Sequence, residues 1–308
     1  MNTRPYVVCH VFAGLNGRID GAYMLDPAAS PARAAYSRMQ VEFGADAVAY
    51  GAVTTKGFVG SRPLALGTHG SAPKGDFVAP HAERSFYISV DPVGEIAWES
   101  ATYRRAGRAD AHVIEVLTEA ASPAYRDYLR ERGVSYVLAG SRGLDLPLAL
   151  RKLRELFGIE RLLVCGGGKT DMSFLAAGVL DELSLVLSPT VSGEPETASV
   201  FDEMPRSAGG SHAFSLERVE RLAGDGLHLV YRVRRRCRAV RFWRLPRGWP
   251  LRAALPAARR TGPPGSRAAP LRARSRRTRP STTSSTTLCS MATGSCSSPQ
   301  RSIRRRRI

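Results

Sequence analysis

Three consecutive glycines, Gly166–Gly168, lie between an apolar run and a stretch with helical spacing. Leu162–Val164 precedes them, apolar positions recur every three or four residues over 172–180, and a second apolar run, Leu183–Leu187, follows. This order predicts strand, glycine turn, helix and strand. Glycines let backbone N–H groups approach a bound group, and the helix directs its positive end to the same place. The segment therefore suits a phosphate-bearing ligand, although an ordinary turn with spare glycines would look the same.

The elements that must position this turn alternate between strands and helices. Strands are predicted at residues 6–13, 45–50, 86–90, 112–117, 134–138, 161–165 and 183–187. Helices are predicted at residues 31–43, 124–132, 147–157 and 172–180. A hairpin is predicted to pair residues 214–222 with 227–233, and residues 60–84 are predicted to form a long surface loop. The alternation predicts an α/β fold with a mostly parallel sheet and an antiparallel pair at its end.

The formal net charge of +18 is concentrated near the C-terminus. Residues 236–308 hold 19 arginines and no acidic residue, so residues 1–235 carry 26 basic and 27 acidic side chains. Periodicity stops in the same place, and we predict a folded body, 1–235, and a disordered tail, 236–308, with too little apolar surface to offset the entropy of ordering it. The tail is either a nucleic-acid-binding segment or an extension without function. Arginine without lysine or acid favours the second.

Metal, disulfide and membrane chemistry find little support in the sequence. The five cysteines are scattered with no Cys-x-x-Cys pair, and the six histidines show no metal-ligand spacing. No apolar stretch reaches the roughly 20 residues that span a membrane. The apolar part of the N-terminus is too short for a signal peptide. We expect no metal site, no membrane segment and a cytoplasmic location.

Four segments together resemble the reductase domain of bacterial bifunctional riboflavin deaminase–reductases. Residues 6–11 with 15–19 are similar to that family's first strand and Leu-Asp-Gly-Lys/Arg loop, and residues 45–54 to its Asp-Ala-(apolar)-x-x-Gly-x-x-Thr segment. Residues 163–168 resemble its cofactor turn, and residues 174–183 its Phe-Leu-x-Ala-Gly-(apolar)-x-Asp-Glu-Leu segment. The resemblance covers about residues 4–235. It implies the fold of dihydrofolate reductase, a mostly parallel central sheet flanked by helices with a C-terminal antiparallel hairpin.

The resemblance also implies NADPH as the hydride donor. The residues that match the turn at the cofactor's pyrophosphate are Gly166, Gly167, Gly168, Lys169 and Thr170. Gly51 and Thr54 match a second cofactor segment, where Thr54 could cap a helix and donate its hydroxyl to a phosphate. Ser89, near the end of its strand, falls where related folds contact the adenosine side.

Substrate contacts implied by the resemblance lie in the first loop and before the glycines. Asn16 stands where the family has Asp, so it keeps hydrogen-bonding capacity but cannot act as a carboxylate base. Arg18 matches the basic residue that contacts the substrate or its phosphate. Cys165 stands where the family commonly has a substrate-facing Glu. From the residue type alone we favour a small buried side chain over a reactive thiol.

One cofactor contact is missing at Ala52, where dihydrofolate reductases have an Arg that grips the 2′-phosphate of NADPH. Its charge could come from Lys56, Arg62 or Arg84, and Arg62 is also a candidate substrate contact.

The function so implied is an NADPH-dependent reductase of a ribosylaminopyrimidine 5′-phosphate, of the 5-amino-6-(5-phosphoribosylamino)uracil type, in riboflavin biosynthesis. Asn16 and Arg18 are its candidate catalytic residues, and a homodimer is expected. Two alternatives stay open. Asn16 and Cys165 could indicate reduction of another small heterocycle or carbonyl compound. In a different class, the basic tail could associate the protein with nucleic acid through charge alone.

Overall fold

The computed structural model describes residues 3–67, 70–203 and 211–234. Its strands are β1 (Tyr6–Ala13), β2 (Ala47–Gly51), β3 (Ser85–Val90), β4 (Thr102–Tyr103), β5 (Ala111–Leu117), β6 (Ser135–Leu138), β7 (Arg161–Val164), β8 (Glu182–Leu187), β9 (Phe214–Arg221) and β10 (Leu227–Val233). Its α-helices are α1 (Ser30–Glu42), α2 (Ala52–Val59), α3 (Pro123–Glu131), α4 (Leu146–Phe157) and α5 (Gly168–Ala176). The predicted tail and its boundary at residues 235–236 lie outside the described residues.

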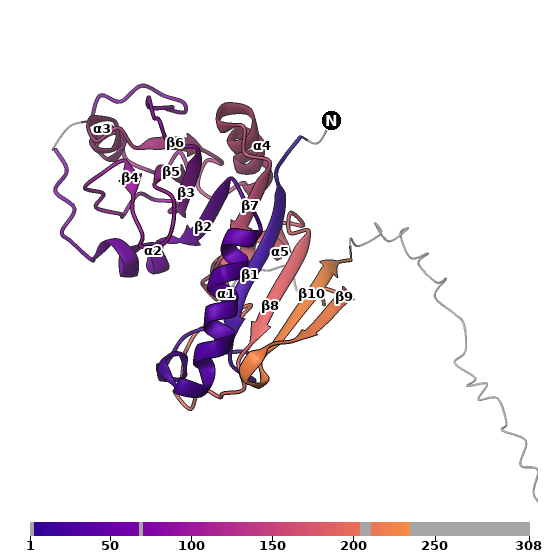
Figure 1. The fold of residues 1–308 in the computed structure, drawn as a ribbon. Coiled ribbons are helices and arrows are strands. Elements are labelled where there is room, and N and C mark those ends of the chain that lie inside the picture. The colour runs from indigo at the N-terminus through magenta and orange to yellow at the C-terminus, as the bar shows by residue number, and fades with distance from the viewer. Residues whose placement is uncertain (1–2, 68–69, 204–210, 235–308) are drawn as a thin grey trace, which may run out of the picture. The chain divides into compact units, whose positions relative to one another are not determined.

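The ten strands of the described residues join one sheet in the order β4-β5-β3-β2-β7-β1-β8-β10-β9, with β6 pairing with β5 (Figure 1). Strands β6, β5, β3, β2, β7, β1 and β8 run parallel, and the hairpin β9–β10 joins β8 in the antiparallel sense. The predicted α/β class, the mostly parallel sheet and the C-terminal hairpin are confirmed. The two-residue strand β4, antiparallel to β5, was not predicted.

Alternating side chains of β1 show how the two faces of the sheet are covered. Val7, Cys9 and Val11 point to the face that α4 and α5 cover. Phe12 points to the opposite face, where it packs against Ala32 of α1. Figure 1 shows α1 lying across β1 and β8 on that face. Helices on both faces are what a parallel sheet requires, because its strands are apolar on both sides.

Local sequence signals fix the starts of the helices that flank the sheet. Ser122 accepts a hydrogen bond from Tyr125 N at the start of α3. Asp145 accepts one from Leu148 N at the start of α4, which ends at Gly158 in the left-handed region. A side-chain oxygen that satisfies a free N–H at the first turn is a typical helix start, and a left-handed glycine is a typical end.

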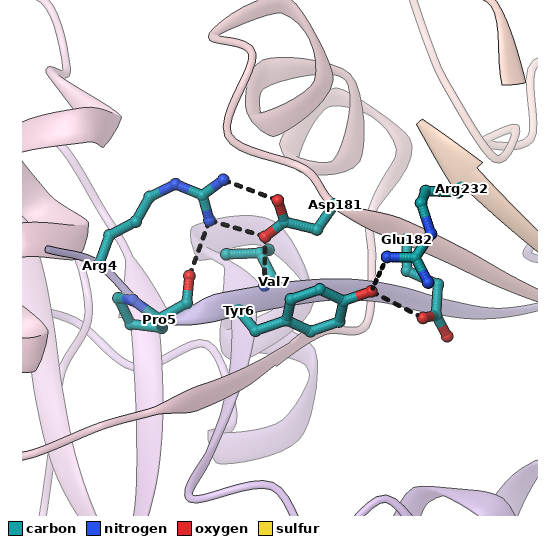
Figure 2. A network of polar contacts seen from close by, with 7 residues as sticks. All are labelled: Arg4, Pro5, Tyr6, Val7, Asp181, Glu182 and Arg232. Carbon is teal, nitrogen blue, oxygen red and sulfur yellow. Dashed lines mark hydrogen bonds and ion pairs between the residues drawn. The ribbon is translucent and has the colours of Figure 1, made fainter. Parts of the chain in front are cut away.

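A polar network at the amino edge of the sheet secures the beginning of the chain (Figure 2). The Arg4 guanidinium donates to both carboxylate oxygens of Asp181, at 2.7 and 2.8 Å, and Val7 N donates to the same carboxylate at 2.9 Å. Beside it, Tyr6 Oη donates to Glu182 Oε2 at 2.9 Å. The Asp-Glu pair of the fourth motif thus ties β1 to β8 and lies at the edge opposite to the glycine turn.

Within the described ranges, no helix is long and apolar enough to cross a membrane. The same residues contain no group of three or more His, Cys, Asp or Glu side chains that could hold a metal ion.

Candidate active site

The glycine turn follows β7, at the carboxyl edge of the parallel strands. Gly166 has a φ of 104°, which favours glycine, whereas Gly167 has an ordinary φ of −60° and is the N-cap residue of α5. The Gly166–Gly167 peptide bond is cis. The φ at position 167 therefore does not require glycine, and only the space around this residue limits which side chain fits there.

Two helix N-termini meet at this turn. Strands β2 and β7 are parallel neighbours, so α2, which follows β2, and α5 both begin at the same edge. Gly51 N donates to Gly166 O at 3.3 Å, and a Cβ on Gly51 would overlap Thr170 Oγ1. The first N–H groups of a helix have no partner within the helix, and both helices direct their positive ends here. This arrangement can bind a phosphate or pyrophosphate.

Thr54 lies at the turn, but it does not cap a helix. The N-cap residue of α2 is Gly51, and Thr54 is the third residue of the helix. A Cβ on Gly167 would lie 3.6 Å from Thr54 Oγ1 and, among the described residues, would meet no other atom within 4 Å outside its neighbours in the chain. The expectation of a Thr54 cap is thus wrong, and its hydroxyl instead faces the space over Gly167.

Charged side chains around the start of α5 have opposing signs. Lys169 is exposed in the first turn of the helix. Asp202 lies on the other side: its N–H donates to Gly168 O at 3.1 Å, and its carboxylate accepts from Ser199 N and Oγ at 2.8 and 2.7 Å. Behind the turn Asp171 is fully buried, and desolvation raises the pKa of its carboxyl well above the ordinary range. The attraction for an anion therefore comes from the helix ends and Lys169.

The first loop and the segment 192–202 form one layer beside the turn. Ile19 N donates to Ala198 O at 2.9 Å, and Val200 N donates to Gly17 O at 3.0 Å. A Cβ on Gly166 would lie 3.7 Å from Ile19 Cδ1. Ile19 belongs to the first-loop motif, but the sequence did not reveal its contact with the turn. The segment 192–202, which has no hydrophobic period and no motif, was not found from the sequence.

The two candidate catalytic residues hold this layer together. Asn16 is exposed, and its Nδ2 donates to Ser192 O at 2.8 Å. Arg18 is half-buried, and its Nη1 donates to Thr197 O. Both side chains thus join the first loop to the 192–202 segment, in the layer that lies beside the glycine turn.

Cys165, directly before the turn, points to the α1 side of the sheet. Its side chain is buried, and its Sγ accepts a hydrogen bond from Gln40 Nε2 at 3.1 Å. Desolvation raises the pKa of the thiol to about 12. Cys165 is therefore neutral at physiological pH, and Gln40 of α1 is a neighbour that the sequence did not reveal.

Several predicted contacts lie away from the turn. Arg62 forms an ion pair with Glu99, and Lys56 forms one with Glu95 at 2.5 Å. Arg62 follows the carboxyl end of α2, so about 12 Å of helix separates it from the N-terminus of that helix. Arg84 precedes β3 and thus lies at the opposite edge of the sheet. The structure does not bring Arg62 or Arg84 to the glycine turn.

Ser89 is also out of reach of a ligand, because its side chain is fully buried. It pairs in register with Glu115 of β5, which is itself fully buried and whose Oε1 accepts a hydrogen bond from Trp98 Nε1. Desolvation raises the pKa of the Glu115 carboxyl well above its ordinary value. The expectation of an adenosine contact at Ser89 does not fit this position.

The buried Glu115 gives the fold a defined pH dependence. Because its pKa is raised on folding, its contribution to stability is complete below its ordinary pKa of 4.5 and is lost as the pH rises. Glu115→Gln cannot titrate, so we expect its unfolding free energy, relative to wild type, to increase between pH 5 and 8 by up to about 1.4 kcal/mol per pH unit. Urea unfolding at several pH values measures this difference. A difference that does not change with pH would contradict the assignment.

Comparison with known proteins agrees with this architecture. Residues 102–228 match the model of the RibD C-terminal domain. The chain is 33% identical to 2,5-diamino-6-ribosylamino-4(3H)-pyrimidinone 5′-phosphate reductase of Methanothermobacter thermautotrophicus over 93 residues. These aligned residues make up 30% of this chain and 42% of that protein. It is 35% identical to the riboflavin biosynthesis protein RibD of Aquifex aeolicus over 97 residues, and this aligned segment makes up 32% of this chain and 26% of that protein.

Among solved structures, a pyrimidine reductase-like protein from Corynebacterium diphtheriae superposes with a TM-score of 0.55 at 16% identity, over 75% of this chain and 92% of that one. The fold is therefore an α/β fold of the dihydrofolate-reductase-like class. More particularly, residues 102–228 match the RibD C-terminal domain, which confirms the resemblance seen in the sequence. The matched segments span less than half the length of either curated relative.

Proposed function

We propose that this chain is an NADPH-dependent reductase of a ribosylaminopyrimidine 5′-phosphate. The observation that carries the proposal is the meeting of the N-termini of α2 and α5 at the glycine turn, in a chain that contains a RibD C-terminal domain. Both curated relatives bear names from this chemistry, one a ribosylaminopyrimidinone phosphate reductase and the other a riboflavin biosynthesis protein.

The residues at the turn fit the pyrophosphate of such a cofactor. Gly167 leaves open space toward Thr54, which a larger side chain would fill. The first N–H groups of α2 and α5, the Thr54 hydroxyl and Lys169 are the groups that would hold the phosphates. A bound nicotinamide would supply a hydride to the ribose-derived carbon, which together with one proton gives the ribityl chain.

A preference for NADPH over NADH requires a positively charged side chain that binds the 2′-phosphate. Lys56 and Arg62, two candidates for the 2′-phosphate, already form ion pairs with Glu95 and Glu99. Exposed ion pairs are weak, about 0–1 kcal/mol, so either side chain can exchange its partner for a phosphate at small cost. We therefore keep NADPH as the proposed donor, with Lys56 and Arg62 as the candidates that would recognise it.

Asn16 and Arg18 take positioning roles in this proposal. Each donates to a backbone carbonyl of the 192–202 segment and thereby holds the first loop beside the turn. The neutral Asn16 amide cannot accept a proton as a carboxylate would. We expect the proton of the reduction to come from another donor, such as water or the substrate itself.

The test is oxidation of NADPH by the purified full chain, followed by absorbance, with the ribosylaminopyrimidine 5′-phosphate as acceptor. We expect turnover that depends on both compounds and is slower with NADH. Turnover with another heterocycle or carbonyl compound, and none with this substrate, would favour the alternative reductase. The proposed homodimer is tested on the same sample by light scattering.

A further inference from the structure

A cavity lies on the α1 side of β2 and β3, and the reductase proposal does not use it. Its volume is about 240 Å³. Val48 and Tyr50 of β2 and Tyr87 of β3 line it from the sheet, the end of α1 lines one side, and residues 103–109 line another. The pocket is smaller than the roughly 300–1,000 Å³ of most ligand sites, so a dinucleotide does not fit it.

Tyrosine rings form the aromatic part of this cavity. The rings of Tyr50 and Tyr87 are stacked, with centroids 5.5 Å apart and an interplanar angle of 22°. The Tyr103 ring lies 4.2 Å from that of Tyr87 at 37°. Tyr50 and Tyr87 are buried and Tyr103 is half-buried, so the cluster is a fixed wall with one accessible ring. Such a wall favours a flat ring that can stack or meet it edge-on.

Two arginines supply positive charge at the same cavity. Arg105 lies over the Phe58 ring, 5.6 Å from its centroid, and Arg108 donates to Ser37 O and Gln40 Oε1. Within the described ranges neither guanidinium has a carboxylate within 4 Å, in contrast to the neighbouring Arg104, which pairs with Asp110 at 3.1 Å. Unneutralised guanidinium groups at a pocket are suited to an anionic ligand.

One acidic side chain also lines the cavity. Asp46 has its Oδ2 engaged by Glu160 N at 2.8 Å and by Arg161 N at 2.9 Å, at the amino end of the sheet. Within the described residues this carboxylate accepts from the two N–H groups and forms no ion pair with Arg105 or Arg108. Two positive charges against one engaged negative charge leave the cavity attractive to an anion.

From this geometry we infer that the cavity is a binding site for a single-ring aromatic anion, with its ring against the tyrosines and its carboxylate or phosphate on Arg105 and Arg108. The site is connected to the glycine turn, because Gln40 accepts from Arg108 and donates to Cys165, the residue before the turn. A ligand that draws Arg108 toward itself also changes the partner of Gln40. Binding at this cavity does not depend on the proposed reductase activity.

Calorimetric titration of the full chain with benzoate tests the inference, with benzamide as the uncharged analogue and cyclohexanecarboxylate as the non-aromatic one. We expect benzoate to bind with a Kd of about 1 mM or lower, and both analogues to bind more weakly. Arg105→Met and Arg108→Met should each weaken benzoate binding by about tenfold or more, since each removes a charge-assisted contact.

Arg104→Met is the matched control, because it removes one charge from the same loop and leaves the arginines of residues 236–308 unchanged. Benzoate affinity should stay at the wild-type value in this variant. Thermal unfolding of each variant verifies the fold. If Arg108→Met fails to fold, Arg105→Met still tests the inference, because the Arg105 side chain donates no hydrogen bond within the described residues and its loss should disturb the fold less. Equal affinity for benzoate and benzamide, no binding by wild type, or equal losses in all three variants would overturn the inference.

Discussion

Replacing Gly167 with valine is expected to weaken NADPH binding by about 100-fold or more while leaving the fold intact. Gly167 has a φ of −60°, which valine adopts, and within the described part of the chain its Cβ would meet only Thr54 Oγ1, at 3.6 Å. The added side chain would fill the space between the N-termini of α2 and α5, where phosphates approach. Loss of two charge-assisted hydrogen bonds, each about 1.5–3 kcal/mol, gives this magnitude. Fluorescence titration with NADPH measures the affinity, and thermal unfolding measures the fold.

Two other glycines provide matched controls for this variant. Gly57 lies within α2, and a Cβ there would meet none of the described residues within 4 Å, so Gly57→Ala should keep the wild-type affinity. Gly166 has a φ of 104°, so Gly166→Val should lower both stability and affinity. A folded Gly167→Val protein that binds NADPH as tightly as wild type would show that the cofactor does not lie at this turn.

Replacing Asp181 with alanine is expected to lower the free energy of unfolding by about 2–4 kcal/mol. The variant removes both hydrogen bonds from Arg4 and the one from Val7 N, and it leaves a half-buried guanidinium without its carboxylate (Figure 2). Urea unfolding at neutral pH gives the magnitude. NADPH affinity should not change, because the network lies at the edge of the sheet opposite to the glycine turn.

The neighbouring acid is the control for Asp181. Glu182 accepts from Tyr6 Oη in the same region, and we expect Glu182→Ala to cost about 1.5 kcal/mol, the low end of the range for a single hydrogen bond to a charged group. If the two alanine variants lost equal stability, the bidentate pair with Arg4 would not be what anchors the beginning of the chain. Loss of NADPH affinity without loss of stability would contradict the structural role.

Local pattern was enough to predict most elements of this fold. The apolar runs at β1, β7 and β8, the glycine turn and the closing hairpin all carry their signal within a few residues. Gly166–Gly168, Lys169 and Thr170 are contiguous, so the sequence alone placed them together. The resemblance then implied a mostly parallel central sheet with a C-terminal antiparallel hairpin, and the observed sheet agrees with that class of fold.

Contacts between distant segments could not be predicted in this way. The ion pair of Arg62 with Glu99, the hydrogen bond from Gln40 to Cys165 and the layer formed by Ile19 with Ala198 depend on where loops lie after folding. Charge alone indicated that Arg62 was available for a ligand, because nothing in the sequence reveals its partner. The sequence also misplaced the start of α2. Its N-cap residue is Gly51, and Thr54 lies inside the first turn, too far along the helix for its hydroxyl to cap it.

A crystal structure of the chain with NADP⁺ tests the central claim most directly. The account predicts the pyrophosphate at the N-termini of α2 and α5, in contact with the backbone of Gly167 and Gly168 and with the Thr54 hydroxyl. A dinucleotide bound elsewhere on the sheet, with the glycine turn still open toward Thr54, would contradict it.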